Sequence, residues 1–129
     1  MQVVALLLTA ALFGGMVFFS FGFAPVLFKL LGLEQTRPIL RGTFPYYYLV
    51  VIGVAGAAAL TAMSASLLGA ALLGAICGST IYARQVLMPR INAATDAGDT
   101  AGFKRLHGAS VVLQLVQIAA CAYALVLIT

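Results

Sequence analysis

The sequence predicts an all-α protein, an integral membrane four-helix bundle whose two termini lie on the non-cytoplasmic side. The first observation is the composition: 64% of the 129 residues are hydrophobic and 8% are charged, against roughly 25% charged residues in soluble domains. The second is that residues 1–28, 42–83 and 106–129 contain no Asp, Glu, Lys or Arg. A soluble domain needs more polar surface than this. The composition therefore excludes a cytosolic enzyme, a secreted disulfide scaffold and a nucleic-acid binder.

The uncharged stretches set the number of membrane spans. An α-helix rises about 1.5 Å per residue, so about 20 apolar residues cross the hydrocarbon core. The first and last stretches suffice for one crossing each, and the central one is about twice as long as one crossing needs. We expect it to fold back near residues 61–66, where small hydroxyl residues can cap helix ends. The chain is then one membrane domain, residues 1–129, with helices at about 3–28, 43–61, 66–84 and 106–128 and loops at 29–42 and 85–105.

Both predicted loops contain helix signals of their own. Glu34 and Arg37 have the spacing of neighbours on a helix face, which predicts a short surface helix at about 34–40. In the second loop, we expect the helix to run on past Arg84 until the residues 96–98 break it. Asp99 or Thr100 then caps the last helix.

The positive charges predict the orientation. All seven lie in the two predicted loops: Lys29, Arg37, Arg41, Arg84, Arg90, Lys104 and Arg105. Because Lys and Arg collect on the cytoplasmic side, both loops are expected there and both termini on the opposite side. The net charge of +4 then reflects topology and contact with anionic lipid headgroups. The predicted location is the plasma membrane (inner membrane) of a bacterium, with the lipid bilayer as the main partner.

Small residues predict which helix faces pack together. Between helices in lipid, close approach through small side chains replaces the hydrophobic effect. Two of the predicted helices have such residues at every fourth position: Gly53, Ala57 and Thr61 in the second, and Ala70, Gly74 and Gly78 in the third. We expect these two rows to form a close hairpin, and the alternative is that they form a dimer interface.

Aromatic residues mark the cytoplasmic ends of the first two predicted helices. Pro25 follows a Phe-rich segment and is expected to kink the end of the first helix, because it removes the hydrogen bond to the carbonyl of Phe21. The sequence 44–48, Phe-Pro-Tyr-Tyr-Tyr, opens the second helix at headgroup depth. Anchoring in the interface is the favoured interpretation, and a platform for a quinone or pigment is the alternative.

A polar stripe runs along the last predicted helix. Its members are spaced 3, 4, 3 and 4 residues apart and therefore share one face: His107, Ser110, Gln114, Gln117 and Cys121. Two glutamines inside an apolar span are costly unless they face protein or water. The structural interpretation is interhelical hydrogen bonding to Ser20, Ser79, Thr80 or Tyr82. The functional interpretation is a polar track for a proton, an ion or a small solute.

The sequence contains no paired carboxylates, nucleophile with a base, phosphate-binding loop or CxxC motif. Copper is the metal considered, because Cys77, Cys121 and His107 are soft or borderline ligands. His107 and Cys121 are 14 residues apart on one helix, or about 21 Å. Cys77 and Cys121 differ in depth by about 10 Å, which is too far for a shared metal or a disulfide. No catalytic residue, cofactor or metal site is therefore predicted.

Four motifs, in this order, resemble the transmembrane protein 205-like family, known in bacteria as domain of unknown function 4149. They are Ala-Pro-Val-Leu-Phe at 24–28, Phe-Pro-Tyr-Tyr-Tyr at 44–48, Met-Pro-Arg-Ile-Asn at 88–92, and Phe-Lys-Arg-Leu-His-Gly-Ala-Ser-Val at 103–111. The resemblance spans nearly the whole chain and implies a small multi-pass protein without an assigned reaction. Its eukaryotic branch is linked to metal-drug tolerance. By position, the family-pattern residues are Pro25, Pro45, Arg90, Asn92, His107 and Ser110.

Two departures accompany this resemblance. Gln114 stands where many relatives are expected to have Asn, which leaves the chemistry of the stripe open. A weaker likeness connects the chain to the anthrone-oxygenase-like membrane family, but the Trp expected near the His is missing, since the chain has no Trp.

The predicted function is that of a non-enzymatic membrane protein, an accessory or assembly subunit of a larger membrane complex, or a homo-oligomer. Its small size and its small-residue surfaces favour this interpretation. The alternative is a small transporter or metal-tolerance protein that uses the polar stripe, and a third possibility is an oxygenase-like membrane enzyme.

Overall fold

The computed structural model describes all 129 residues, and its secondary structure is entirely helical. In chain order the elements are α1 (Gln2–Val17), the π-helical turn η1 (Phe18–Phe23), α2 (Ala24–Ala62), α3 (Leu67–Tyr82), the π-helical turn η2 (Ala83–Leu87), α4 (Met88–Asp96) and α5 (Thr100–Ile128). Three continuous helical stretches are long and apolar enough to cross a membrane: Gln2–Ala62, Leu67–Asp96 and Thr100–Ile128. The predicted all-α class is confirmed.

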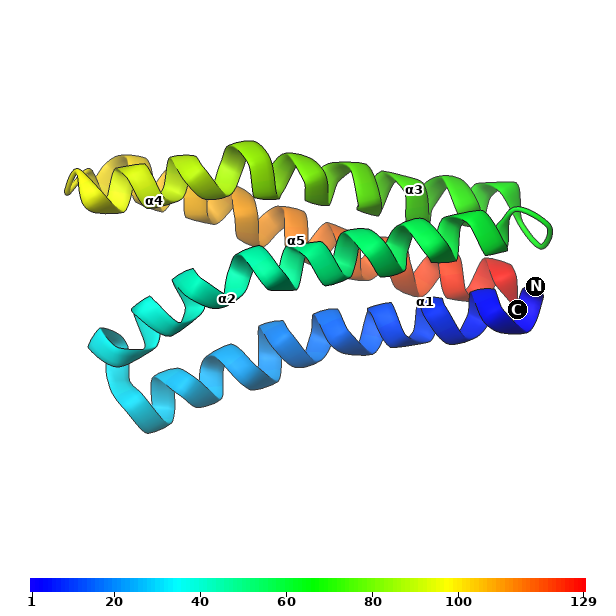
Figure 1. Cartoon of the computed structure of the whole chain (residues 1–129), viewed down its shortest axis with the longest axis horizontal. Coiled ribbons are helices and arrows are strands. Elements are labelled where there is room, and N and C mark those ends of the chain that lie inside the picture. Colours follow the sequence, from blue (N-terminus) through cyan, green and yellow to red (C-terminus); the bar gives the residue numbers. More distant parts are fainter.

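The first of these stretches reverses its direction at a single residue. Gly32 has φ 77° and ψ 175°, a backbone conformation that is essentially restricted to glycine. The chain therefore turns back, and α2 runs beside α1 in the opposite direction (Figure 1). Across the reversal, the buried hydroxyl of Thr36 donates a hydrogen bond to the carbonyl of Leu27 at 2.8 Å. Residues 29–42, expected as a loop, are thus helical on both sides of Gly32.

At the same end of the molecule, α4 leads into α5 through a short turn. α4 ends at Asp96, and Gly98 takes the left-handed conformation with φ 69°. The Asp99 side chain then accepts a hydrogen bond from the backbone N–H of Gly102 at 2.9 Å, which caps α5. The break and the cap lie where the sequence predicts them. The rest of the predicted loop 85–105 is helical, since α4 continues η2 and α5 begins at Thr100.

The opposite end holds both termini and the turn between α2 and α3 (Figure 1). α2 ends at Ala62, and the side chain of Ser66 caps α3 by accepting a hydrogen bond from the N–H of Gly69 at 3.0 Å. This confirms the predicted turn and its hydroxyl cap. The termini are joined by a hydrogen bond of 2.8 Å from the side-chain amide of Gln2 to the carbonyl of Ile128.

Both π-helical turns come just before a proline. Pro25 follows η1 and Pro89 follows η2. A proline inside a helix has no N–H to donate and clashes with the carbonyl four residues earlier. A wider π-helical turn accommodates this defect without breaking the helix, and such turns occur often at functional sites. The irregularity predicted at Pro25 lies where the structure has this local widening.

The hydrophobic core occupies the half of the molecule nearer the termini. Its thirteen buried members come from α1, the C-terminal part of α2, α3 and the C-terminal part of α5. They are Ala5, Leu12, Met16, Val51, Ala55, Ala58, Ala62, Ala70, Leu73, Ile76, Cys121, Ala124 and Ile128. Neither π-helical turn nor α4 contributes a residue to this core. Polar and aromatic contacts therefore hold the other half together, and its cavities lie there.

Candidate functional site: a polar cavity between the helices

A cavity of about 250 Å³ lies in the half of the molecule that the hydrophobic core leaves open. It is lined by residues of η1, α2, α4 and α5. Its polar, uncharged lining residues are Ser20, Asn92, His107, Ser110 and Gln114, with Tyr48 beside them. Three members of the predicted polar stripe, His107, Ser110 and Gln114, are thus brought together with Asn92 around one space. Asn92, His107 and Ser110 are also family-pattern residues.

Gln114 is at the inner end of this cavity. Its side-chain nitrogen donates one hydrogen bond to the hydroxyl of Ser20, at 2.9 Å, and another to the hydroxyl of Tyr47. These bonds connect α5 to η1 and to α2. Ser20 is one of the partners that the structural interpretation names, whereas Tyr47 was expected at the membrane surface. The side-chain oxygen of Gln114 accepts no hydrogen bond from the chain and is available to a molecule in the cavity.

The second glutamine closes the space beyond Gln114. The amide of Gln117 is buried and donates to the hydroxyls of Ser79, at 2.8 Å, and Thr80, at 3.0 Å. One turn further, the thiol of Cys121 donates to the carbonyl of Thr9 at 3.5 Å. Neither Gln117 nor Cys121 lines the cavity. The stripe is therefore divided into a cavity-lining part, residues 107–114, and a part that joins helices.

Aromatic rings form one wall of the site. Phe19 stacks on Tyr47 with ring centroids 4.0 Å apart and planes 14° apart. Phe44 meets both rings edge-on. Tyr48 is buried, whereas Tyr46 is 71% exposed. The predicted interface anchoring therefore suits Tyr46 alone, because successive residues of a helix point about 100° apart and cannot all face the lipid.

Two polar side chains of the lining make no hydrogen bond within the chain: Asn92 and His107. Asn92 is half-buried, whereas His107 is exposed and its ring stacks on Phe103, with centroids 5.3 Å apart and planes 8° apart. The half-buried hydroxyl of Ser110 is paired with the hydroxyl of Tyr48 and can still accept a further hydrogen bond. The cavity thus presents hydrogen-bonding groups to a molecule that enters it.

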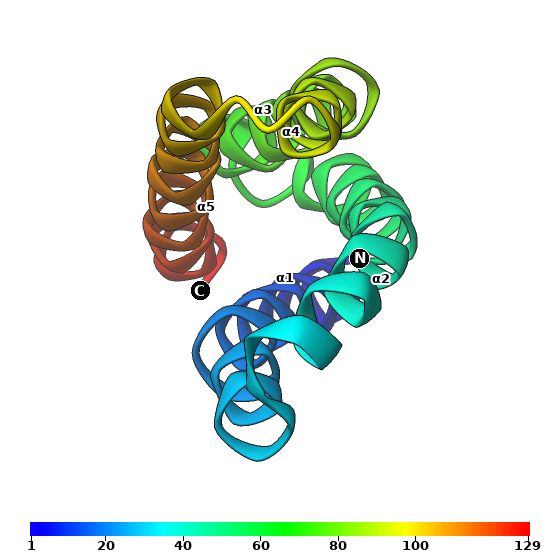
Figure 2. The same ribbon diagram turned by 90° about the vertical axis from the view of Figure 1, so that its left-hand side faces the viewer.

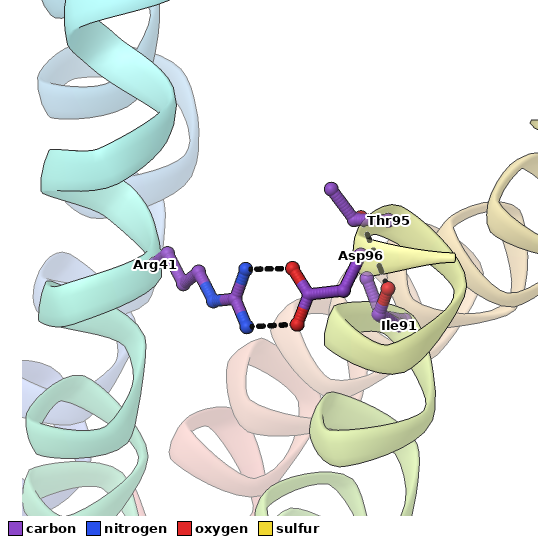
Figure 3. Close-up of polar contacts among 4 residues, drawn as sticks. All are labelled: Arg41, Ile91, Thr95 and Asp96. Atoms are coloured by element: carbon purple, nitrogen blue, oxygen red, sulfur yellow. Dashed lines mark hydrogen bonds and ion pairs between the residues drawn. The ribbon is translucent and has the colours of Figure 1, made fainter. Parts of the chain in front are cut away.

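A bidentate ion pair bridges the mouth of the cavity. The Arg41 guanidinium of α2 donates to the two carboxylate oxygens of Asp96 on α4, at 2.7 and 2.8 Å (Figure 3). The hydrogen bond and charge of Arg41 lower the pKa of Asp96, and Asp96 in turn raises the pKa of Arg41. Arg41 also lines an adjoining groove of about 810 Å³. The ion pair joins the two segments that the sequence predicts as loops.

The α2–α3 interface differs from the one predicted. Gly53, Ala57, Gly74 and Gly78 are exposed, and at each of these three glycines an added Cβ would meet no atom within 4 Å. Of the predicted packing residues, only Ala70 is buried. The buried face of α2 instead carries Val51, Ala55, Ala58 and Ala62. Small residues occur on both faces of these helices, so their spacing does not identify the buried face.

The remaining family-pattern residues lie at the edge of the site. Pro25 and Arg90 are exposed. The carbonyl of Pro45 accepts a hydrogen bond from Nε of Arg84 at 3.2 Å, which joins η2 to α2. The structure contains no group of three or more His, Cys, Asp or Glu side chains that could hold a metal ion.

The length of the helices and their apolar composition define the class: this is a helical membrane protein. The chain belongs to the family described as Domain of unknown function (DUF4149), whose model matches residues 7–100. The matched range includes Pro25, Pro45, Arg90 and Asn92, and it ends before the polar stripe of α5 begins. No curated protein matches the chain, and neither does any solved structure.

Proposed function

We propose that the chain crosses a bacterial plasma membrane four times, as one four-helix domain with both termini on the non-cytoplasmic side. The reversal at Gly32 supports this, because it divides the first long helical stretch into two antiparallel arms. The two termini lie at one end of the molecule, together with the turn after α2. All seven Lys and Arg residues belong to the segments 29–41 and 84–105, around the turns at the other end. The positive-inside rule then assigns that end to the cytoplasm.

Reporter fusions test this topology. A reporter fused after Gly98 is expected to be active in the cytoplasm, and one fused at the C-terminus is expected to be active on the other side. An odd number of crossings between the two positions gives this result. Reporters on the same side would contradict the four-span topology.

Within the membrane, the function that the site supports best is non-enzymatic binding of a small molecule in the polar cavity. The observation that carries this proposal is the set of hydrogen-bonding groups that face the cavity: Asn92 and His107, which have no partner in the chain, the free oxygen of Gln114, and the hydroxyl of Ser110. The lining contains no Asp or Glu, and no hydrogen bond joins Ser110 to His107. Binding is therefore proposed in place of a reaction.

Native mass spectrometry of the protein released from membrane vesicles tests this function. The unaltered chain is expected to carry a small-molecule adduct, and Ser110→Phe is expected to lose it, because the new ring fills the cavity. Ala109→Phe is the matched control and is expected to keep the adduct, since Ala109 is the neighbouring residue but is exposed. Spectra without an adduct on the unaltered chain, or an adduct that Ser110→Phe retains, would contradict the proposal.

The second candidate function is that of an accessory or assembly subunit beside a larger membrane complex, or of a homo-oligomer. It is supported by the exposed small residues Gly53, Ala57, Gly74 and Gly78, which leave room for another helix to approach closely. The same spectra test it, because a stoichiometric partner chain or a second copy would appear as an added mass.

The alternative function is that of a small transporter or metal-tolerance protein that uses the polar stripe. Only the part of the stripe that lines the cavity, residues 107–114, supports it. The hydrogen bonds of Gln117 to Ser79 and Thr80 lie between the cavity and the end with the termini. A transport cycle must open this contact. The cavity is lined by Met88 but by neither cysteine.

A further inference from the structure

The charges and hydrogen-bonding groups that line the cavity indicate which class of molecule it binds. This inference rests on the proposed binding function. The only charged side chain in its lining is Arg41. The guanidinium of Arg41 already donates two hydrogen bonds to Asp96. A charged ligand that moved from water into the cavity would therefore find no free opposite charge there, and its desolvation would cost free energy. Asn92, Ser110 and the oxygen of Gln114 instead offer uncharged hydrogen-bonding groups. The cavity favours an uncharged ligand.

The size and walls of the cavity favour a planar ring. Its volume of about 250 Å³ is just below the usual range for drug-sized ligands, about 300–1,000 Å³. One ring with its substituents fits, whereas a whole phospholipid does not. Phe19 and Phe44 line the space, and aromatic side chains pack well against the face or edge of another ring.

The outer rim of the cavity is apolar and exposed. Phe21, Val111 and Leu115 line the cavity, yet they remain 60%, 43% and 47% exposed. They belong to η1 and α5, and the view along the bundle shows α5 standing apart from the helices of residues 18–40 at this end (Figure 2). In the proposed topology this opening faces the hydrocarbon of the bilayer, so an apolar tail can remain among the lipids while the ring enters.

The hydrogen-bonding groups along α5 determine which polar substituents the ring of the ligand needs. Ser110 and Gln114 are four residues apart, or about 6 Å along the helix. Both face the same cavity. Because the free atom of Gln114 is an acceptor oxygen, a ligand that satisfies both needs hydrogen-bonding groups at two separated positions, with a donor facing Gln114. Two hydroxyls on one ring meet this requirement.

We propose that this cavity binds a lipid-soluble, uncharged ring compound of the quinol class, which enters from the bilayer between η1 and α5. The ring lies beside Phe19 and Phe44, and its tail extends past Phe21 and Leu115. One ring hydroxyl donates a hydrogen bond to the side-chain oxygen of Gln114, and the other bonds to the hydroxyl of Ser110. The proposal concerns binding alone and includes no redox step.

Photolabelling of the full chain in nanodiscs tests the ligand class. The probe is an azido-substituted decylbenzoquinol, kept reduced under argon, and competing decylbenzoquinol gives the affinity. We expect labelled peptides from η1 and from residues 107–115. Ser110→Ala is expected to weaken competition about threefold to tenfold, the effect of one lost hydrogen bond. The variant also removes the contact of Ser110 with the Tyr48 hydroxyl, so its circular dichroism spectrum is compared with that of the unaltered chain.

Two controls make the result decisive. Ser64→Ala makes the same substitution in the turn after α2, far along the chain from the cavity, and is expected to leave the affinity unchanged. Decyl phosphate, with the same tail and a charged headgroup, is expected not to compete. If decyl phosphate competes and decylbenzoquinol does not, the ligand class is wrong and the proposed binding function still stands. Labelling outside the cavity, or equal affinity in Ser110→Ala, would also overturn the ligand class. An adduct in the native mass spectra decides the binding function separately.

Discussion

Replacing Ala58 by leucine is expected to lower the free energy of unfolding by about 1–3 kcal/mol, the usual cost of adding methylenes to a packed core. Ala58 is fully buried on the face of α2 that belongs to the hydrophobic core. A larger side chain there must displace its neighbours, because closely packed helices leave no room for it. Unfolding in mixed micelles, followed by circular dichroism against the mole fraction of denaturing detergent, measures the change.

Ala57→Leu is the matched control for Ala58→Leu. The two alanines are adjacent, but Ala57 is exposed, so its substitution is expected to change the free energy of unfolding by less than about 0.5 kcal/mol. This pair distinguishes the two possible packing faces of α2. A larger loss at Ala57 than at Ala58 would show that the helix packs through the row of small residues that the sequence spacing favours.

Gly32→Ala is expected to destabilise the protein by about 1–3 kcal/mol, the cost of holding a residue with a Cβ in a sparsely populated backbone conformation. The cause is the backbone alone, since a Cβ on Gly32 would meet no atom within 4 Å. The reversal of the chain depends on this residue, because helix precedes and follows it directly. The same detergent titration measures the loss.

A second glycine separates this effect from a general effect of glycine replacement. Gly42 also has open space around it, but its backbone is helical. Gly42→Ala is therefore expected to leave stability unchanged or to raise it by up to about 1 kcal/mol, because alanine favours the helix. Equal losses at both positions would contradict the assignment of the reversal to Gly32.

Local sequence signals predict several features of this fold correctly. The cap at Asp99, the turn before Ser66 and the break after Asp96 each depend on a few neighbouring residues. Such features can be read directly from sequence because capping groups and left-handed glycines act within one helical turn. The reversal at Gly32 is local too, but nothing in the sequence distinguishes this glycine from Gly42 or from the other glycines in the helices.

The candidate site is harder to predict, because its residues come from four separate elements. The spacing on α5 identifies His107, Ser110 and Gln114 as one face, and the family pattern identifies Asn92. Phe19 and Arg41 are not identified as site residues, and Tyr47 is identified only in the alternative interpretation of residues 44–48 as a platform for a quinone or pigment. Each belongs to another helix, and its direction depends on how that helix is rotated against α5. The aromatic run at 44–48 could have signalled an inward face, since its consecutive rings cannot all point to the lipid.

Composition and charge distribution alone predict that this protein is helical and belongs in a membrane, because uncharged apolar segments of about 20 residues or more have the length and hydropathy of membrane-spanning helices, which satisfy their own backbone hydrogen bonds in lipid. Only the tertiary structure decides which face of each helix is buried and where the chain leaves a cavity. Gln114 and Gln117 show the reason. They are the same residue type, three positions apart on one stripe, yet Gln114 borders an open space and Gln117 joins α5 to α3. The difference comes from the helices packed against them, because the core residues of the terminal half bring α3 close to Gln117, whereas η1 and α4 leave space beside Gln114.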